Sequence, residues 1–161
     1  MSETAVVNAS PLIYLARTQF LHLLQLAAPE VFIPRAVAAE VSARGSSDPA
    51  ARALAETPWL RQVEAASIPD EVLGWDLGPG ESSVIAWALA HPDCLAIIDD
   101  LEGRRCAETL GIRLRGTLGL VLRARRQNVV AEARPVLVAL RAAGMYLSDR
   151  IVNTALAELG E

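Results

Sequence analysis

Two adjacent aspartates near position 100 carry the strongest chemical signal in the sequence. Asp99 and Asp100 directly follow the apolar run 95–98, which is predicted to form a strand. Ligands of open parallel sheets bind beyond the carboxyl ends of the strands, so both carboxylates lie where a site is expected. They repel one another unless a cation or an arginine lies beside them. One of them can cap the following helix, but a cap accounts for only one acid, and a metal-binding role is therefore favoured.

Three other oxygen-bearing side chains lie where they can join this pair. Glu81 starts an apolar stripe of helical spacing, so its carboxylate is expected beside the sheet, where an unpaired charge is costly. A favourable place in the first turn of a helix explains Glu81 equally well. Glu40 borders the apolar face of a helix predicted over 35–44, although an exposed glutamate is the ordinary case there. Asn8 ends the first predicted strand, 5–7.

These side chains together suit a hard divalent cation. Carboxylate and amide oxygens are the donors that Mg²⁺ and Mn²⁺ take, and the two ions share the same donors. Carboxylates clustered around divalent ions activate water and stabilise the leaving oxygen in phosphodiester cleavage. The candidate metal and catalytic set is Asn8, Glu40, Glu81, Asp99 and Asp100.

The elements that must position these residues alternate between short apolar runs and helical patterns. Strands are predicted at 5–7, 31–33, 62–65, 95–98 and 112–114. Helices are predicted from Pro11, with Ser10 as N-cap, and then over 35–44, 50–56, 81–90, 101–110, 118–127, 132–142 and 149–159, with another turn or second helix over 21–26. Gly111 and Ser148 mark a helix end and a helix start. This alternation predicts an α/β fold, residues 1–161 as one domain, whose mostly parallel sheet is covered on both faces.

Composition excludes several classes of function. The chain has 161 residues, with 15 arginines and no lysine, so a P-loop and a Schiff-base nucleophile are excluded. A receiver-like signalling domain would lack its essential lysine, and a dinucleotide-binding motif would lack its third glycine, where Ser83 stands. Cys94 and Cys106 do not have the spacing of a zinc site with the two histidines, and they are expected in the core. No apolar run approaches the ~18 residues of a membrane span, and no signal peptide is visible, so a cytoplasmic protein is expected.

Charge is spread unevenly along the sequence. The net charge is −4, but residues 1–100 hold 13 acids and 5 arginines, whereas residues 101–161 hold 6 acids and 10 arginines. This asymmetry is a weak indication of a polyanionic partner, and the solvated surface of a helix explains it as well. The arginines that are candidates for RNA contacts are Arg104, Arg105, Arg123, Arg125 and Arg126.

Five segments follow one another along the chain: VVNASPLIYLAR, VFIPRAVAAEV, LGPGESSVIAWALA, LAIIDDLEGRRCAETLGI and GTLGLVLRARRQNVV. In this order they resemble a subfamily of PIN domains that is related to the VapC-like toxins of bacteria and archaea. The resemblance covers nearly the whole chain, from about Val6 to Leu156. Five ordered segments are a specific signal, whereas any one of them alone is weak.

The resemblance implies a three-layer α/β/α PIN fold with a five-stranded, mostly parallel sheet. It also implies a metal-dependent endoribonuclease, commonly the toxin of a type II toxin–antitoxin pair, with RNA as substrate, a small antitoxin protein as partner and a homodimer as assembly. The family's acidic positions correspond in order to Asn8, Glu40, Glu81 and the pair Asp99–Asp100. Asp100 is the preferred ligand of that pair. Ser10 matches a hydroxyl residue that is expected to orient metal-bound water.

Asn8 departs from the aspartate that is usual at the family's first acidic position. An amide oxygen still ligates a hard cation, but it is neutral and cannot act as a base, so the affinity for metal is expected to fall. The sequence therefore leaves a second interpretation open, in which the chain is a catalytically weakened PIN-fold module that binds RNA or a protein partner.

Overall fold

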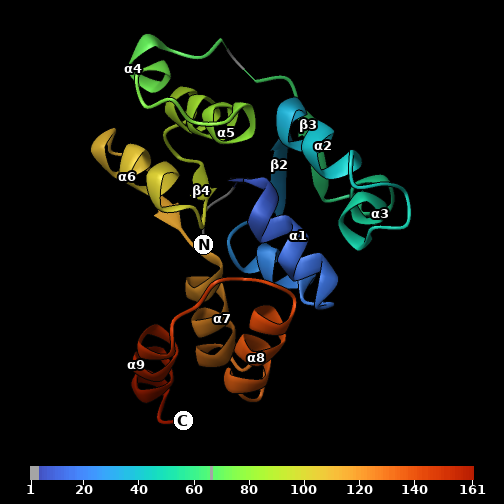
Figure 1. Cartoon of the computed structure of the whole chain (residues 1–161), viewed down its shortest axis with the longest axis vertical. Coiled ribbons are helices and arrows are strands. Elements are labelled where there is room, and N and C mark those ends of the chain that lie inside the picture. Colours follow the sequence, from blue (N-terminus) through green and yellow to red (C-terminus); the bar gives the residue numbers. More distant parts are fainter. Residues whose placement is uncertain (1–3, 66) are drawn as a thin grey trace.

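Five parallel strands form one sheet in the order β3–β2–β1–β4–β5 in the computed structural model, which describes residues 4–65 and 67–161 (Figure 1). The strands are β1 Thr4–Val7, β2 Glu30–Pro34, β3 Leu60–Val63, β4 Leu95–Ile97 and β5 Leu114–Arg115. The central strands β1 and β4 are almost wholly apolar and buried, as strands covered on both faces must be. The predicted α/β class with a parallel five-stranded sheet is confirmed.

Helices cover both sides of this sheet (Figure 1). They are α1 Ala9–Arg17, η1 Leu21–Leu26, α2 Arg35–Ser42, α3 Pro49–Glu56, α4 Asp70–Leu73, α5 Pro79–Ala90, α6 Leu101–Thr109, α7 Thr117–Arg126, α8 Arg134–Ala142 and α9 Asp149–Leu159. The last three helices lie together at one end of the molecule, with α7 in contact with η1, α8 and α9. None of the described helices combines the length and the apolar character that are needed to span a bilayer.

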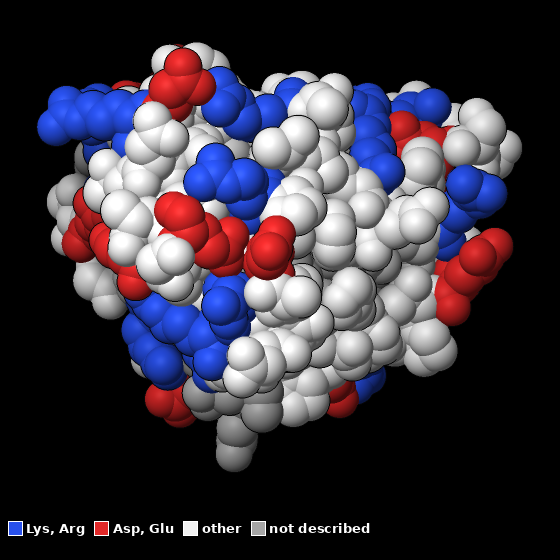
Figure 2. All heavy atoms as spheres, turned by 90° about the horizontal axis from the view of Figure 1, so that it is seen from below, with Lys and Arg blue, Asp and Glu red and all other residues white. Residues whose placement is uncertain are grey.

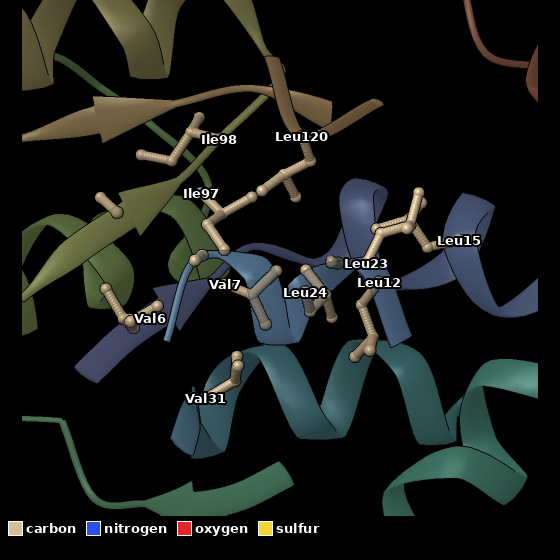
Figure 3. Packing of buried hydrophobic residues seen from close by; sticks show 14 of the residues in the cluster. Val6, Val7, Leu12, Leu15, Leu23, Leu24, Val31, Ile97, Ile98 and Leu120 are labelled. Carbon is tan, nitrogen blue, oxygen red and sulfur yellow. The ribbon is translucent and has the colours of Figure 1, made fainter. Parts of the chain in front are cut away.

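The core forms where β1 and β4 meet the helices on either side. Figure 3 shows the residues that pack there, Val6 and Val7 of β1, Leu12 and Leu15 of α1, Leu23 and Leu24 of η1, and Ile97, Ile98 and Leu120. Each buried leucine of this kind contributes about 1.5–3 kcal/mol relative to an exposed one. Cys94 and Cys106 are also buried, which confirms the prediction that they are core residues. This packing fixes the strand ends from which the candidate site is built.

The start of α1 differs from the prediction because sheet pairing continues one residue beyond β1. The backbone N–H of Asn8 donates to the carbonyl of Ile97, and Asn8 keeps an extended conformation. The helix therefore begins at Ala9, with Asn8 in the N-cap position. The prediction that Ser10 caps this helix is wrong, and Ser10 lies inside its first turn.

Two strands are also displaced from their predicted positions. β3 begins at Leu60 because Leu60 pairs with Val31 in the register of β2, and it ends where β2 ends. β5 begins later than predicted because Ile112 is still bound to the end of α6, where its N–H donates to the carbonyl of Ala107. Gly111 makes this helix end possible with φ +72, as its type and position predicted. No pattern in the sequence led us to predict the short helix α4.

Candidate acidic site at the carboxyl ends of the strands

The order of the strands brings Asn8 and the two aspartates to the same edge of the sheet. β1 and β4 are neighbouring parallel strands, and Val7 lies opposite Ile97 in their register. Asn8 follows the first strand directly, and Asp99 and Asp100 follow the second after Ile98. Glu40 and Glu81 come to this edge on helices α2 and α5, which pack against each other. The site predicted from the sequence therefore draws on four elements.

Asn8 and Glu40 approach the start of α5 from two sides. Asn8 is 4% exposed, and although it occupies the N-cap position of α1, its side chain makes no capping hydrogen bond. A Cβ on Gly80 would lie 3.6 Å from Oδ1 of Asn8 and 2.9 Å from Oε2 of Glu40. A larger residue at position 80 would collide with the carboxylate of Glu40, so glycine allows both oxygens to lie beside the start of α5. The amide oxygen of Asn8 therefore lies at the start of α5, beside the same glycine as the carboxylate of Glu40.

Glu81 and Asp100 meet in the same way across α6. A Cβ on Gly103 would lie 3.7 Å from Oε2 of Glu81 and 3.9 Å from Oδ2 of Asp100. The pKa of Glu81 is raised by partial burial, and then by the negative charges of Asp100 and Glu40. Three carboxylates therefore act on one another at this edge. Asp100 and Glu40 are exposed, so the acidic site opens to solvent and is accessible to a large substrate.

Helix α5, which carries Glu81, is buried on more sides than its apolar stripe predicts. The helix lies against β1, β2 and β4 and is flanked by α2 and α6, so Ser82 and Ser83 are buried along with its apolar residues. Both serine hydroxyls donate to backbone carbonyls of the preceding turn, Ser83 to Pro79 at 2.7 Å. The predicted apolar stripe is confirmed, because Val84, Ile85 and Ala88 are buried, and burial extends beyond it because neighbours enclose this helix on several sides.

Asp99 points to a different partner from Asp100. Its carboxylate accepts a hydrogen bond from the backbone N–H of Thr117 at 2.7 Å and another from the Thr117 hydroxyl at 2.6 Å. Burial raises the pKa of Asp99, while Thr117 and the nearby Arg104 act to lower it. Gly116, the N-cap of α7, has no side chain that could cap the helix, so Asp99, which is remote in the sequence, supplies the acceptor. Asp99 thus positions α7, and the contacts found for it do not place it with Glu40 and Glu81.

Asp100 has a structural contact as well as its acidic neighbours. It is the N-cap of α6, and its Oδ2 accepts a hydrogen bond from the backbone N–H of Gly103 at 3.1 Å. A cap was the alternative to metal binding in the sequence, and this contact satisfies one lone pair of one carboxylate. The remaining acceptor capacity of Asp100 is free to take part in the site beside Glu81. Ser10 is half-buried in the first turn of α1, two residues after Asn8.

The predicted RNA-binding arginines fall into two groups. Most of them are engaged within the protein. Arg104 donates to the carbonyl of Ile98, and the pairs Arg105–Glu102, Arg125–Glu161 and Arg126–Glu158 join neighbouring side chains. On the face shown in Figure 2, basic and acidic groups are intermixed from the left up to the centre and along the right-hand edge, and the area to the right of the centre is uncharged. Arg123 forms the second group, because its buried Nε has no hydrogen-bond partner among the described residues, and burial and then the charge of Arg123 lower the pKa of Arg115.

The donor chemistry at this edge fits a divalent cation, although no compact ligand cluster exists in advance. Within residues 4–65 and 67–161, no three histidine, cysteine or acidic side chains lie close enough together to hold a metal ion. The nearby oxygens of Asn8, Glu40, Glu81 and Asp100 are all hard donors of the kind that Mg²⁺ and Mn²⁺ prefer. A cation would also relieve the repulsion that raises the pKa of Glu81. The residues present therefore suit such an ion in the chemistry of their donors, and their side chains would have to come closer together to hold it.

Comparison with known proteins identifies the family that the chain resembles. A family model described as a PIN domain matches residues 4–161. No curated protein matches the sequence closely enough to count as a relative. The match runs from the first strand to the last helix and includes every candidate site residue, so it rests on the whole fold and not on a single motif.

Proposed function

The chain belongs to the PIN-domain family, whose members are generally nucleases, and from this premise we propose that it is a metal-dependent endoribonuclease. The observation that carries the proposal is the meeting of Glu40, Glu81 and Asp100 at the carboxyl edge of the sheet, where burial and then the charges of Asp100 and Glu40 raise the pKa of Glu81. Uncompensated acids of this kind are costly in a protein that does not use them. They are explained if the site works with a cation and an RNA phosphate.

The acids and Asn8 would have separate roles in this reaction. Asn8, Glu40, Glu81 and Asp100 would hold Mg²⁺ or Mn²⁺. When bound, such an ion supplies positive charge that stabilises the phosphate as negative charge develops on it. Glu81 has the raised pKa of a group that can accept a proton from the attacking water, whereas the neutral amide of Asn8 cannot. Asp99 would act indirectly, by holding α7 in place through Thr117.

We also propose a biological setting, the toxin of a type II toxin–antitoxin pair. Its support is the resemblance of five ordered segments to the VapC-like subfamily. A small antitoxin protein would then control the nuclease, and the exposed acids Glu40 and Asp100 offer a place for its arginine, because a guanidinium can replace the charge of a metal. A homodimer is part of the same proposal. Of the apolar residues near the C-terminus, Val152 and Leu156 pack into the core, while Ile151 is exposed at 45%.

The decisive experiment measures cleavage of labelled RNA. Purified protein is incubated with single-stranded and structured RNA in Mg²⁺, in Mn²⁺ and in EDTA, beside the variants Asp100→Asn and Asp93→Asn. Asp93 is an exposed aspartate before β4, so its variant makes the same change of charge outside the site. We expect cleavage that EDTA and Asp100→Asn abolish and that Asp93→Asn leaves intact. Cleavage that survives in Asp100→Asn would refute the assignment of the site.

A second candidate function is favoured by Asn8 alone. A neutral side chain at the family's first acidic position, together with ligands that are not drawn together in advance, would suit a module that binds RNA or protein without cutting. The variant Asn8→Asp separates the two candidates, because it restores the missing negative charge at a position whose side-chain oxygen lies, like that of Glu40, beside Gly80. Metal-dependent cleavage that appears only in Asn8→Asp would establish the binding module as the natural function.

A further inference from the structure

A second feature of the surface lies along β5 and α7, outside the acidic site. It is an open groove of about 420 Å³, lined by Arg115, Gly119, Leu122, Arg123, Arg126 and Gln127. We call it the arginine groove. Three of its lining residues are arginines, and among the described residues that line it none is acidic. A concave surface with this composition attracts anions.

The arginines of this groove are poorly neutralised by the protein itself. Arg115 is crowded by two other arginines, because its pKa is lowered first by burial and then by the charges of Arg123 and Arg113. In the part of the chain that the structure describes, the buried Nε of Arg123 has no hydrogen-bond partner. Arg126 reaches Glu158 only at the exposed rim, at 3.4 Å. A buried donor without an acceptor is costly, so a ligand with anionic oxygens would stabilise this arrangement.

The arginine groove is adjacent to the acidic site through β5. Arg115 is the last residue of β5, and its carbonyl accepts a hydrogen bond from Ile98, the residue before the two aspartates. The next residue, Gly116, lies against Asp99, since a Cβ there would be 3.0 Å from its Oδ1. A chain molecule that crosses the carboxyl ends of β4 and β5 would therefore pass both features. The groove has the position of a subsite, separate from the residues that would act on the cleaved bond.

We propose that the arginine groove binds a backbone phosphate of the RNA strand, next to the bond that the acidic site cleaves. This inference rests on the proposed function and adds to it the residues that hold the substrate. Arginine presents a planar fork of donors that matches phosphate oxygens, and contacts with phosphate position a strand without reading its sequence.

The test changes the charge of the groove at Gln127, an exposed lining residue whose substitution should not disturb folding. Affinity for a fluorescent single-stranded RNA is measured by anisotropy in EDTA, with Asp100→Asn in every protein so that no strand is cut. We expect Gln127→Glu to weaken binding about threefold to tenfold and Gln127→Arg to strengthen it by a similar factor. The matched control is Gln62→Glu on β3, at the opposite edge of the sheet, which should change affinity little.

The dependence of binding on salt tests whether a phosphate is the ligand. Each phosphate contact contributes about 0.7 to the slope of log affinity against log salt for a single strand. Arg115→Gln and Arg123→Gln should each reduce this slope by about that amount, while Arg61→Gln on β3 should leave it unchanged. Melting temperatures of all variants are compared first, and Arg126→Gln, at the exposed rim, replaces any groove variant that does not fold.

The outcomes separate this inference from the nuclease proposal. If the chain cuts RNA but Gln127→Glu and Gln127→Arg bind and cut like Gln62→Glu, the groove proposal is overturned and the nuclease remains. If no cutting is found but RNA affinity follows the charge at position 127, phosphate binding in the groove is supported, while the nuclease and the place of the groove beside a cleaved bond are overturned. Binding of a poly-glutamate peptide in the groove more tightly than RNA would also overturn the proposal, because it would assign the groove to an acidic protein.

Discussion

Asp99 and Asp100 are neighbours in the sequence, but they lie in regions of opposite electrostatic character. Burial raises the pKa of Asp99, but two donors from Thr117 and the nearby Arg104 compensate part of the cost of its charge within the protein. Asp100 faces Glu81, and Glu81 also experiences the charge of Glu40. In the second region, Asp100 caps α6, but the acids lie beside further negative charge. None of the ion pairs among the described residues includes Glu40, Glu81 or Asp100.

The difference shows that partners, and not residue type or strand position, decide what an acid does here. A compensated carboxylate stabilises the fold, because breaking its hydrogen bonds leaves buried donors unpaired. Carboxylates that repel one another reduce stability and store free energy that a bound cation can recover. The region around Asp99 is therefore structural, and the region around Asp100 is suited to function. Each prediction below changes one side of this contrast.

The largest effect is expected when one acid of the repulsive region is neutralised. Glu81→Gln should lower the rate of RNA cleavage by about 100-fold or more, which corresponds to about 2.7 kcal/mol in the barrier. The reason is that the amide keeps the shape of the side chain but loses the proton acceptor and the negative charge. Rates of the variant and the wild type are compared at saturating metal. Glu56→Gln, on the exposed side of α3, is the matched control and should cleave normally.

The same chemical change at the two adjacent aspartates should affect stability in only one case. Asp99→Asn should lower the free energy of unfolding by about 2 kcal/mol, because the charged acceptor of both Thr117 donors is lost. Asp100→Asn should leave it unchanged or slightly higher, since asparagine caps a helix as well as aspartate does and the repulsion with Glu81 is removed. Urea unfolding of the two variants measures the difference. Equal losses of stability would contradict the contrast between the two regions.

Addition of metal should stabilise the protein through the repulsive region. At a Mg²⁺ or Mn²⁺ concentration ten times the dissociation constant, the folded state gains about 1.4 kcal/mol. For a domain of this size the melting temperature should then rise by about 3–6 °C. Differential scanning fluorimetry measures the shift, and Glu81→Gln should reduce it while Asp99→Asn should retain it at a lower starting temperature. A shift that is identical in wild type and Glu81→Gln would place the ion elsewhere.

Much of the fold could be predicted from local signals in the sequence. Gly111 and Ser148 mark a helix end and a helix start, and both act as their types predict, Ser148 by accepting a hydrogen bond from Ile151. Apolar runs located β1, β2 and β4, because a strand buried on both faces must be apolar throughout, whereas the edge strands β3 and β5 were predicted with displaced bounds. The displaced ends of α1 and β5 depend instead on single backbone hydrogen bonds, of Asn8 and Ile112, that join two separate elements.

The candidate site could be predicted only as far as strand order determines it. Neighbouring parallel strands bring Asn8 and Asp100 together, and this follows from the positions of these residues after their strands. The role of Asp99 could not be deduced, because Thr117 lies 18 positions away and is joined to it only by the tertiary fold. Which arginines pair within the protein and which line the groove could not be predicted either, because some of their partners are also distant in the sequence. Gly116 before Thr117, a helix start without its own cap, is the signal that would have suggested an outside acceptor.

The smallest effect concerns the response of the metal-free protein to pH. Because the pKa of Glu81 is raised in the folded state, that state binds its proton more tightly than the unfolded chain does. The contribution of Glu81 to the free energy of unfolding therefore falls as pH rises from the ordinary glutamate pKa to the raised one, and it stays low at neutral pH. Glu81→Gln removes this loss, so the variant should be more stable than wild type at pH 7, by less than about 1 kcal/mol because the group is partly exposed.

The difference between the two proteins should disappear below the ordinary glutamate pKa, where wild-type Glu81 is protonated in both states. Urea unfolding in EDTA at several pH values measures this difference directly, and titrating groups far from Glu81 cancel because both proteins share them. A variant that is less stable than wild type at pH 7 would mean that Glu81 has a compensating partner, as Asp99 has. The same substitution would then remove both activity and stability. If it instead lowers activity and raises stability, Glu81 is retained at a cost to the fold, as a functional acid is expected to be.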